Sequence, residues 1–237
     1  MTQQPAPTGK KVKVEAMFND IAPKYDFLNH FLSLGIDIQW RKKVRKLLAP
    51  YKPKTILDVA TGTGDLAIEL SKLQPEKIIG LDIATNMLDI GKEKIKTKKL
   101  DQLIEMQLGD SEDLPFEDQM FDAVTVAFGV RNFENLQKGL REMNRVLKPG
   151  GIAAVLEFSK PKAFPVKQIY NFYFKYILPG FGKLVSKSKD AYTYLPESVS
   201  AFPEDKAFID ELRHAGFDKI IQKRLTMGIA TLYSAHK

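Results

Sequence analysis

Between residues 55 and 158 the sequence alternates short apolar runs with segments of helical periodicity, and this alternation constrains the fold more than any other feature. The apolar runs predict five strands, at residues 55–59, 77–81, 103–108, 121–126 and 151–158. The segments between them predict helices over residues 65–73, 86–98 and 136–147. Strands that alternate with helices are typical of a parallel sheet wrapped by helices. The expected fold class is therefore α/β.

The C-terminal part of the chain departs from this alternation. A helix is expected over residues 204–215, followed by β-like runs at residues 219–224 and 229–235. Because no helix separates the two runs, we expect them to pair antiparallel as a hairpin at one edge of the sheet. The helix over residues 136–147 should end at the Lys148-Pro149-Gly150-Gly151 stop signal.

Two further segments lie outside the alternation and are expected to build a ligand site. Residues 14–50 precede the first strand and look helical, and residues 160–202 follow the fifth strand. Open α/β sheets bind ligands at the carboxyl ends of their strands, where such insertions gather. We expect a lid at residues 14–50 and a cover for the substrate pocket at residues 160–202, within a single domain over residues 14–237. Residues 1–13 are polar, hold two prolines and are expected to form a flexible tail.

Composition excludes several kinds of chemistry. The 237 residues include no cysteine, which rules out disulfides, thiolate nucleophiles and cysteine metal sites, and no metal site is predicted. No stretch is apolar over the roughly 20 residues of a membrane-spanning helix. The polar start of the chain lacks the apolar core of a signal peptide. The expected location is therefore the cytoplasm.

The formal net charge of +7 favours anionic partners, either nucleic acid or an anionic membrane surface. Much of this charge lies in residues 41–46 and 92–99, and both segments have helical apolar spacing. We expect them to be solvated helix faces, with a membrane-facing patch as the alternative. Charge is the only feature that suggests a nucleic-acid-binding module, so nucleic acid is not an expected partner.

A glycine loop follows the first predicted strand, in the sequence Asp58-Val-Ala-Thr-Gly62-Thr-Gly64-Asp65. Its two glycines let a ligand approach main-chain N–H groups without a Cβ in the way. The loop also satisfies the G-x-G-x-x-G/A dinucleotide pattern through Ala67, and Asp82 is placed where an acid would hold a ribose. An NAD-dependent oxidoreductase is therefore a competing hypothesis.

Acidic residues at successive strand ends favour S-adenosylmethionine over a dinucleotide. The carboxylate of Asp58 would repel a pyrophosphate but attract the ammonium group of S-adenosylmethionine. Asp110 and Ser111, after the third strand, suit an adenine amino group. Together with Asp82 these acids resemble the class I methyltransferase pattern, which implies a Rossmann-like, seven-stranded, mostly parallel sheet. The expected cofactor-binding residues are Asp58, Gly62, Thr63, Gly64, Asp82, Asp110 and Ser111.

Longer motifs carry a closer resemblance. They are Tyr25-Asp26-Phe27-Leu28-Asn29, Leu32-Ser33-Leu34-Gly35 with Trp40-Arg41, Phe128-Gly129-Val130-Arg131-Asn132, Arg145-Val-Leu-Lys-Pro-Gly-Gly151, Leu156-Glu157-Phe158-Ser159-Lys160-Pro161 and Tyr192-Thr-Tyr194-Leu195-Pro196 with Phe202-Pro203. From about residue 18 to the C-terminus the chain resembles the ubiquinone/menaquinone C-methyltransferase family. The resemblance implies C-methylation of a polyprenylated quinol, demethylmenaquinol, with S-adenosylmethionine as donor. A benzoquinol of the ubiquinone pathway, or another small molecule, is the alternative acceptor.

Three positions depart from the family pattern. The family often has histidine where this chain has Asp37, methionine where it has Leu28 and serine where it has Ala127. The exchange at Leu28 is neutral if that side chain only packs. Asp37 argues against a catalytic histidine at its position, and Ala127 removes one polar contact for the cofactor.

The segment after the fourth strand also favours a carbon acceptor. Methyltransferases that act on exocyclic amines usually carry an Asn/Asp-Pro-Pro-aromatic run there, which this chain lacks. Methylation of RNA cytosine at C5 commonly needs a cysteine nucleophile. A quinol that loses a hydroxyl proton becomes a phenolate, whose charge reaches the neighbouring ring carbon. The enzyme then has only to align this carbon with the methyl group and stabilise the phenolate.

Arg131 is the predicted catalytic residue, as the cation that stabilises the phenolate. The alternative for Arg131 is a surface ion pair with Glu134 or Glu157. The residues expected to line the quinol pocket are Tyr25, Asn132, Tyr192 and Tyr194. Each tyrosine could also only pack, or relay a proton. His30 is expected to be structural, and the general base is not assigned.

Residues 164–185 mix aromatic side chains with lysines, a combination that suits the headgroup region of a bilayer. We expect peripheral contact with an anionic membrane, and a helix that only covers the core is the alternative. A naphthoquinol is favoured because the start of the chain has no organelle-targeting segment. The sequence does not fix the oligomeric state, and a homodimer is compatible with it.

Overall fold

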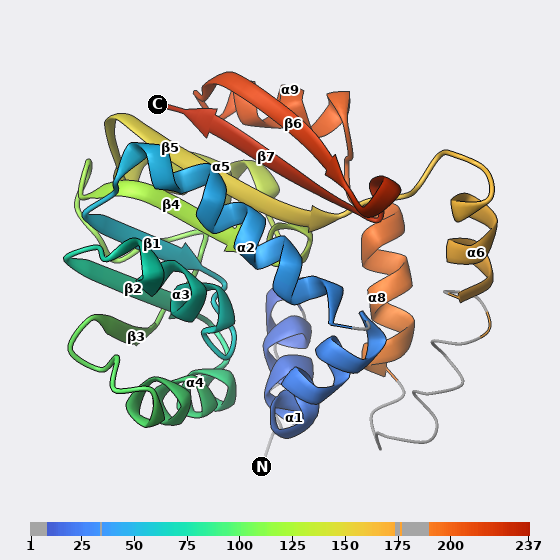
Figure 1. Ribbon diagram of the computed structural model, residues 1–237, viewed down its shortest axis with the longest axis horizontal. Coiled ribbons are helices and arrows are strands. Elements are labelled where there is room, and N and C mark those ends of the chain that lie inside the picture. The colour runs from blue at the N-terminus through green and yellow to red at the C-terminus, as the bar shows by residue number, and fades with distance from the viewer. Residues whose placement is uncertain (1–8, 34, 174–175, 177–189) are drawn as a thin grey trace, which may run out of the picture.

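A seven-stranded sheet with the strand order β3-β2-β1-β4-β5-β7-β6 forms the centre of the molecule (Figure 1). The computed structural model describes residues 9–33, 35–173, 176 and 190–237. The strands are β1 Thr55–Val59, β2 Lys77–Asp82, β3 Ile104–Leu108, β4 Phe121–Ala127, β5 Leu147–Phe158, β6 Asp218–Leu225 and β7 Ala230–His236. The pairs among β1 to β5 are parallel, and β7 pairs antiparallel with both β5 and β6. The predicted mostly parallel sheet with a C-terminal antiparallel pair is confirmed.

Helices cover both faces of this sheet. They are α1 Lys10–Leu32, α2 Ile36–Leu48, α3 Asp65–Leu70, α4 Thr85–Thr97, α5 Leu136–Val146, α6 Val166–Phe172, α8 Asp190–Ala201 and α9 Lys206–His214. Successive residues of a strand point to opposite faces, so Ile56 of β1 joins a buried cluster with α2 and α3, and Leu57 joins one with α5 and α9. Both side chains are fully buried, and each such burial contributes about 1.5–3 kcal/mol.

The N-terminal helix begins earlier than the sequence predicts. The sequence predicts a flexible tail that includes residues 10–13, but α1 starts at Lys10 and these residues form its first turn. The side chain of Lys10 donates hydrogen bonds to the main-chain oxygens of Arg131 and Phe133, and Lys11 pairs with Asp110. These contacts hold the first turn against the sheet. Gly35, with a φ of +73°, then lets the chain turn from α1 into α2.

The start of β5 also differs from the prediction. The strand begins at Leu147, which pairs with Phe121, and the register then shifts so that Ile152 pairs with Ala123. The extra residues include Gly150, whose φ of +77° allows the bend. The predicted stop signal therefore does end α5, but it forms an irregularity inside the strand rather than a loop before it.

The segment between β5 and α9 stands apart from the sheet. Helix α6 lies at the periphery and α8 lies between it and α1 (Figure 1). Among the described residues, no helix is long and apolar enough to cross a membrane.

Candidate active site

A cavity opens at the carboxyl ends of β1, β2, β3 and β4. Its lining includes Val14, Phe18 and Tyr25 from α1 and Met87 from α4. The remaining residues lie at or after the strand ends: Ala60 and Gly62 after β1, Leu81 to Ile83 at β2, Gly109 to Glu112 after β3, and Ala127 to Gly129 with Asn132 to Glu134 at and after β4. Carboxyl ends of neighbouring parallel strands meet at one edge, where open α/β sheets bind their ligands. Of the predicted cofactor-binding residues, the lining includes Gly62, Asp82, Asp110 and Ser111.

The glycine loop is held to the end of β2 by Asp82. One carboxylate oxygen of Asp82 accepts the N–H of Gly62 at 2.8 Å, and the other accepts the N–H of Ala84 at 2.9 Å. Burial raises the pKa of this carboxyl, and the two N–H groups act against that rise. Gly62 and Gly64 have φ values of +57° and +80°, in the left-handed region that favours glycine. The loop therefore presents main chain to the cavity in a conformation that Asp82 fixes.

Asp58 lies beneath the loop rather than on the cavity lining. Its carboxylate accepts hydrogen bonds from the hydroxyls of Thr61 at 2.6 Å and Thr125 at 2.7 Å. The side chain is 1% exposed, and this burial raises its pKa from 3.8 to about 6. Its side-chain partners are thus the hydroxyls of Thr61 in the loop and Thr125 in β4, and its contact with the cofactor ammonium stays a prediction.

The raised pKa of Asp58 predicts a pH-dependent contribution to stability. Because the folded state binds this proton more tightly than the unfolded chain, the contribution is present at low pH and is lost as pH rises towards 6. The shift corresponds to about 3 kcal/mol. Asp58→Asn cannot lose a proton at this position. The free energy of unfolding of Asp58→Asn, minus that of the native chain, should therefore rise by about 3 kcal/mol between about pH 4 and pH 8, measured by urea unfolding. A difference that does not change with pH would contradict this assignment.

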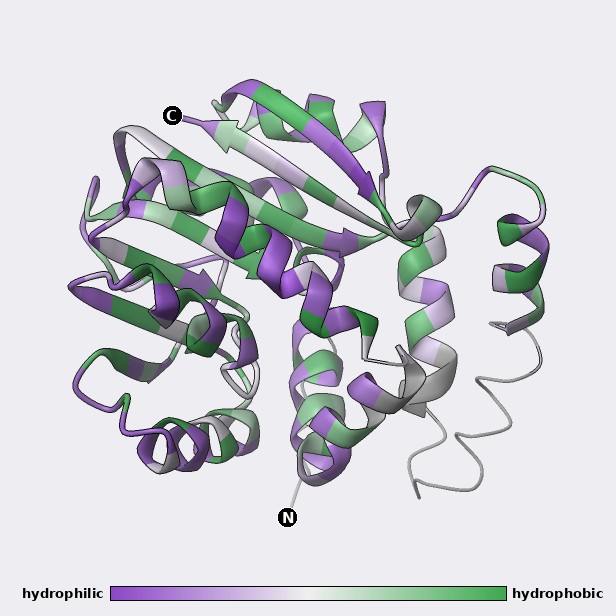
Figure 2. Ribbon diagram, viewed as in Figure 1, coloured by the Kyte–Doolittle hydropathy of each residue, from purple (hydrophilic) through white to green (hydrophobic). Residues whose placement is uncertain are grey.

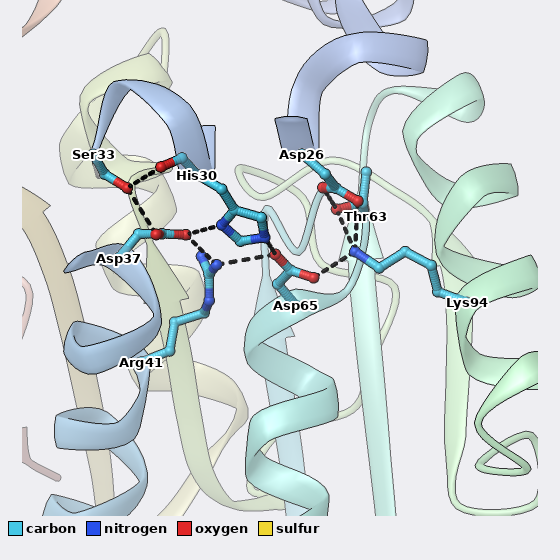
Figure 3. Close-up of polar contacts among 8 residues, drawn as sticks. All are labelled: Asp26, His30, Ser33, Asp37, Arg41, Thr63, Asp65 and Lys94. Carbon is cyan, nitrogen blue, oxygen red and sulfur yellow. Dashed lines mark hydrogen bonds and ion pairs between the residues drawn. The ribbon is translucent and has the colours of Figure 1, made fainter. Parts of the chain in front are cut away.

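The other loop residues contact the N-terminal helix. Thr63 is 2% exposed, and its hydroxyl donates to Oδ1 of Asp26 in α1 at 2.6 Å (Figure 3). Neither Thr63 nor Gly64 is part of the cavity lining. Their predicted contacts with a cofactor remain predictions, and the structure places Thr63 at the junction between the loop and α1.

Asp110, another residue of the cavity lining, is already engaged by the protein. One oxygen of its carboxylate accepts the N–H of Glu112 at 2.9 Å, and the other pairs with the ammonium of Lys11. This hydrogen bond raises the pKa of Lys11, although burial acts against it. Lys11 also lines the cavity. Sequence reasoning missed Lys11, because nothing near it in the chain indicates that it reaches Asp110.

Arg131 forms a buried ion pair, not the surface pair considered from the sequence. Its Nη1 lies 2.8 Å from Oε1 of Glu157 and also donates to the main-chain oxygen of Phe128. The guanidinium lies 5.4 Å from the centre of the Phe158 ring, within cation–π range. Burial raises the pKa of Glu157, and the charge of Arg131 opposes that rise. Glu134, the other predicted partner, instead accepts the main-chain N–H of Lys10 at 2.9 Å.

The candidate substrate residues divide into three groups. Tyr25 and Asn132 line the cavity, and burial raises the pKa of the Tyr25 hydroxyl. Tyr194 of α8 donates to Oδ1 of Asn132 at 3.0 Å and so reaches the cavity through it. Tyr192 lies outside the residues whose side chains the structure describes.

Phe128 is a cavity residue that the sequence analysis did not single out. Its φ of +60° is unusual for a bulky side chain, and its ring lies 4.4 Å from that of Phe158. Trp40 of α2 adds a third ring 5.8 Å from Phe128. The position of Phe128 directly after β4 was the available signal, because residues that follow parallel strands reach the ligand site.

Comparison with known proteins identifies the family. The family model described as the ubiE/COQ5 methyltransferase family matches residues 7–237. The chain belongs to this family. A demethylmenaquinone methyltransferase from Bacteroides fragilis is 50% identical over 96% of this chain and 94% of its own length. A protein of the same name from Porphyromonas gingivalis is 46% identical over 96% and 94%. A ubiquinone/menaquinone biosynthesis C-methyltransferase UbiE from Geobacter sulfurreducens is 43% identical over 97% and 90%.

Solved structures agree on the fold. A SAM-dependent methyltransferase from Thermotoga maritima superposes with a TM-score of 0.66 at 19% identity and covers 94% of this chain and 99% of its own. One from Aquifex aeolicus superposes with a TM-score of 0.54 at 21% identity, over 80% and 87%. These structures show that the chain has the class I methyltransferase fold. Its membership of the ubiE/COQ5 methyltransferase family makes it a methyltransferase with S-adenosylmethionine as methyl donor. The competing NAD-dependent oxidoreductase is set aside.

Proposed function

We propose that this ubiE/COQ5-family enzyme transfers a methyl group from S-adenosylmethionine to a ring carbon of demethylmenaquinol. The observation that carries the proposal is one cavity lined both by the glycine loop and strand-end acids and by the segment from Ala127 to Glu134. A donor held by the first set and an acceptor held by the second would meet in the same space. Relatives at 46–50% identity that bear the name demethylmenaquinone methyltransferase support this substrate.

The acidic side chains that line the cavity fit S-adenosylmethionine as the methyl donor. The carboxylates in the lining belong to Asp82, Asp110, Glu112 and Glu134. This excess of negative charge favours a ligand with a sulfonium and an ammonium over a pyrophosphate. In our proposal Asp82 accepts the ribose hydroxyls, Asp110 and Ser111 hold the adenine, and Gly62 brings main-chain groups close to the ligand. S-adenosylmethionine supplies an electrophilic methyl group there.

The acceptor end of the cavity suits an aromatic ring with an ionised hydroxyl. Phe128 and Phe133 offer apolar wall, and the amide of Asn132 offers hydrogen bonds. Arg131 holds a permanent positive charge in the same turn, and a cation in a water-poor site stabilises a phenolate strongly. We propose that Asn132 contacts the phenolate oxygen and that the charge of Arg131 lowers the energy of the anion from behind it. Tyr194 orients Asn132 through its hydrogen bond.

Competition between two quinols tests the choice of acceptor. The purified enzyme receives equal amounts of reduced demethylmenaquinone and of the demethylated benzoquinol, with labelled S-adenosylmethionine. We expect the naphthoquinol to take the label at least about tenfold faster, a difference of 1.4 kcal/mol in transition-state binding. Faster labelling of the benzoquinol would overturn the substrate and leave the methyltransferase activity in place.

We also propose that the segment around α6 contacts an anionic membrane, from which a polyprenylated quinol must be drawn. Phe164, Ile169 and Phe172 are 82%, 64% and 56% exposed. Lys162 precedes them in the sequence and Lys167 lies between them. Hydrophobic and hydrophilic residues alternate along this peripheral helix (Figure 2). Aromatic rings beside lysines suit the headgroup region. Tyr176 is 59% exposed in the same segment, whereas Tyr170 is buried, and Phe174 and Phe181 lie outside the described residues. The homodimer and the cytoplasmic location stay predictions.

Replacing two aromatic residues tests the membrane contact. Phe164→Ser combined with Phe172→Ser should lower co-sedimentation with anionic vesicles by at least about fivefold, because each buried ring contributes on the order of 1.5 kcal/mol or more. Ile221→Ser, which removes a 65% exposed side chain on edge strand β6, serves as the control. Equal binding of the double variant and the native chain would remove this surface as the contact.

A further inference from the structure

Beside the cavity, the ammonium of Lys94 in α4 contacts three oxygen atoms at once (Figure 3). Its Nζ lies 2.8 Å from Oδ2 of Asp26 and 3.1 Å from Oγ1 of Thr63, and it also pairs with Oδ1 of Asp65. An ammonium has three N–H donors, and these contacts use them all. Asp26 belongs to α1, whereas Thr63 and Asp65 flank Gly64 in the cofactor loop. Lys94 therefore joins the N-terminal helix to the loop.

The other carboxylate oxygen of Asp65 contacts a residue of α2, so the same network of charges includes that helix. Arg41 donates to Oδ2 of Asp65 at 3.0 Å and also pairs with Asp37. The Nδ1 atom of His30 in α1 lies 2.7 Å from Oδ2 of Asp37. Burial alone would raise the pKa of Asp37, but the hydroxyl of Ser33, the charge of Arg41 and His30 hold it below its usual value. Both N-terminal helices are thus tied to the residue that follows Gly64 (Figure 3).

Helix α4 approaches the loop closely at Gly91, one turn before Lys94. A Cβ added to Gly91 would lie 3.2 Å from the main-chain carbonyl carbon of Thr63 and 2.4 Å from Cε of Met106. The side chains of Lys94, Asp26 and Asp65 are 23%, 30% and 26% exposed. Water therefore screens these pairs only in part, and pairs that share one ammonium form a network, which stabilises more than isolated surface pairs do.

We propose that Lys94 is a positioning residue for the methyl donor. Its ammonium sets the spacing between α1, which forms one wall of the cavity, and the glycine loop, whose Gly62 lines another. The proposal rests on the cofactor site proposed above. Without the ammonium, the negative charges of Asp26 and Asp65 are less neutralised and repel each other more strongly. Helix α1 then separates from the loop more often. The donor then leaves the cavity faster, while the acceptor end of the cavity is unchanged.

Lys94→Met tests this role, with Lys92→Met as the matched control. Lys92 lies in the same helix and carries the same charge, but its described ion pair joins it to exposed Asp89 at 3.2 Å. We expect Lys94→Met to raise the dissociation constant and the release rate of S-adenosylhomocysteine about tenfold, a change of 1.4 kcal/mol. The KM for S-adenosylmethionine should rise equally and kcat should stay within about twofold. Lys92→Met should leave all four values unchanged.

Binding is measured by calorimetry, and release by the fluorescence of Trp40, the single tryptophan of the chain. Native affinity and release rate in Lys94→Met would overturn the proposal, as would a lower melting temperature with unchanged binding by the folded protein. If Lys94→Met does not fold, Asp26→Asn keeps the shape and removes one of the two carboxylates that face Lys94, and the same increases are expected. Because S-adenosylhomocysteine binding needs no acceptor, a native enzyme that binds it but methylates no quinol contradicts the proposed function alone.

Discussion

Arg131→Met should lower turnover at least about tenfold, corresponding to 1.4 kcal/mol, and lower the free energy of unfolding by about 3–5 kcal/mol. The second effect follows because Glu157 is 0% exposed and would lose the cation that lies 2.8 Å away. The first follows because the phenolate would lose its nearby positive charge. The affinity for S-adenosylhomocysteine should stay within about twofold in the folded variant, since Arg131 is not part of the cavity lining.

A second substitution separates the two effects. Arg131→Met combined with Glu157→Gln removes both buried charges, so most of the lost stability should return in urea unfolding. Turnover should remain low, because the cation is still missing. If turnover recovers together with stability, Arg131 serves the fold through Glu157 and has no part in stabilising the phenolate.

Asp82→Asn should weaken S-adenosylmethionine binding at least about thirtyfold, corresponding to 2 kcal/mol. Both oxygens of Asp82 accept main-chain N–H groups, from Gly62 and Ala84. An asparagine amide would present its own N–H to one of these donors, and an unsatisfied buried donor costs about 1–3 kcal/mol. The loop would shift, and the ribose hydroxyls would lose a charged acceptor.

Calorimetry with S-adenosylhomocysteine measures the effect of Asp82→Asn. Asp89→Asn is the control, because Asp89 is an exposed carboxylate of α4 that pairs with Lys92. It should bind like the native chain. Affinity within about threefold of native in Asp82→Asn would show that this carboxylate holds neither the loop nor the ribose.

The elements of the sheet could be predicted because their signals are local. In β1, each residue from Ile56 to Val59 is buried, which the apolar run indicates directly. The start of β5 could not be predicted in the same way. Its bulge depends on how Leu147 and Ile152 pair with β4, and that pairing joins segments distant in the sequence.

The position of each predicted acid relative to the end of its strand explains which of them line the cavity. Asp82 is the last residue of β2, and Asp110 follows the end of β3, so both reach the cavity. Asp58 lies one residue before the end of β1 and instead meets the hydroxyls of Thr61 and Thr125. The sequence shows that an acid is near a strand end, but it does not show whether the side chain reaches the cavity or lies beneath the loop.

Contacts between distant segments carried no sequence signal. The pair of Lys11 with Asp110 joins residues 99 positions apart, and the chain offers 36 lysines and arginines as candidates. Asp37, noted as a departure from the family pattern, has a clear place in the structure. It is buried and accepts from Ser33 while it pairs with His30 and Arg41, so it binds α1 to α2.

The most direct test is the position of the methyl group in the product. The enzyme is incubated with ¹³C-methyl S-adenosylmethionine and demethylmenaquinone, once chemically reduced and once oxidised, and the product is examined by NMR. We expect a ring-carbon methyl signal with the reduced quinol and none with the oxidised quinone, because only the quinol can form a phenolate. A methyl signal on oxygen, or equal methylation of the oxidised quinone, would contradict carbon methylation through a phenolate.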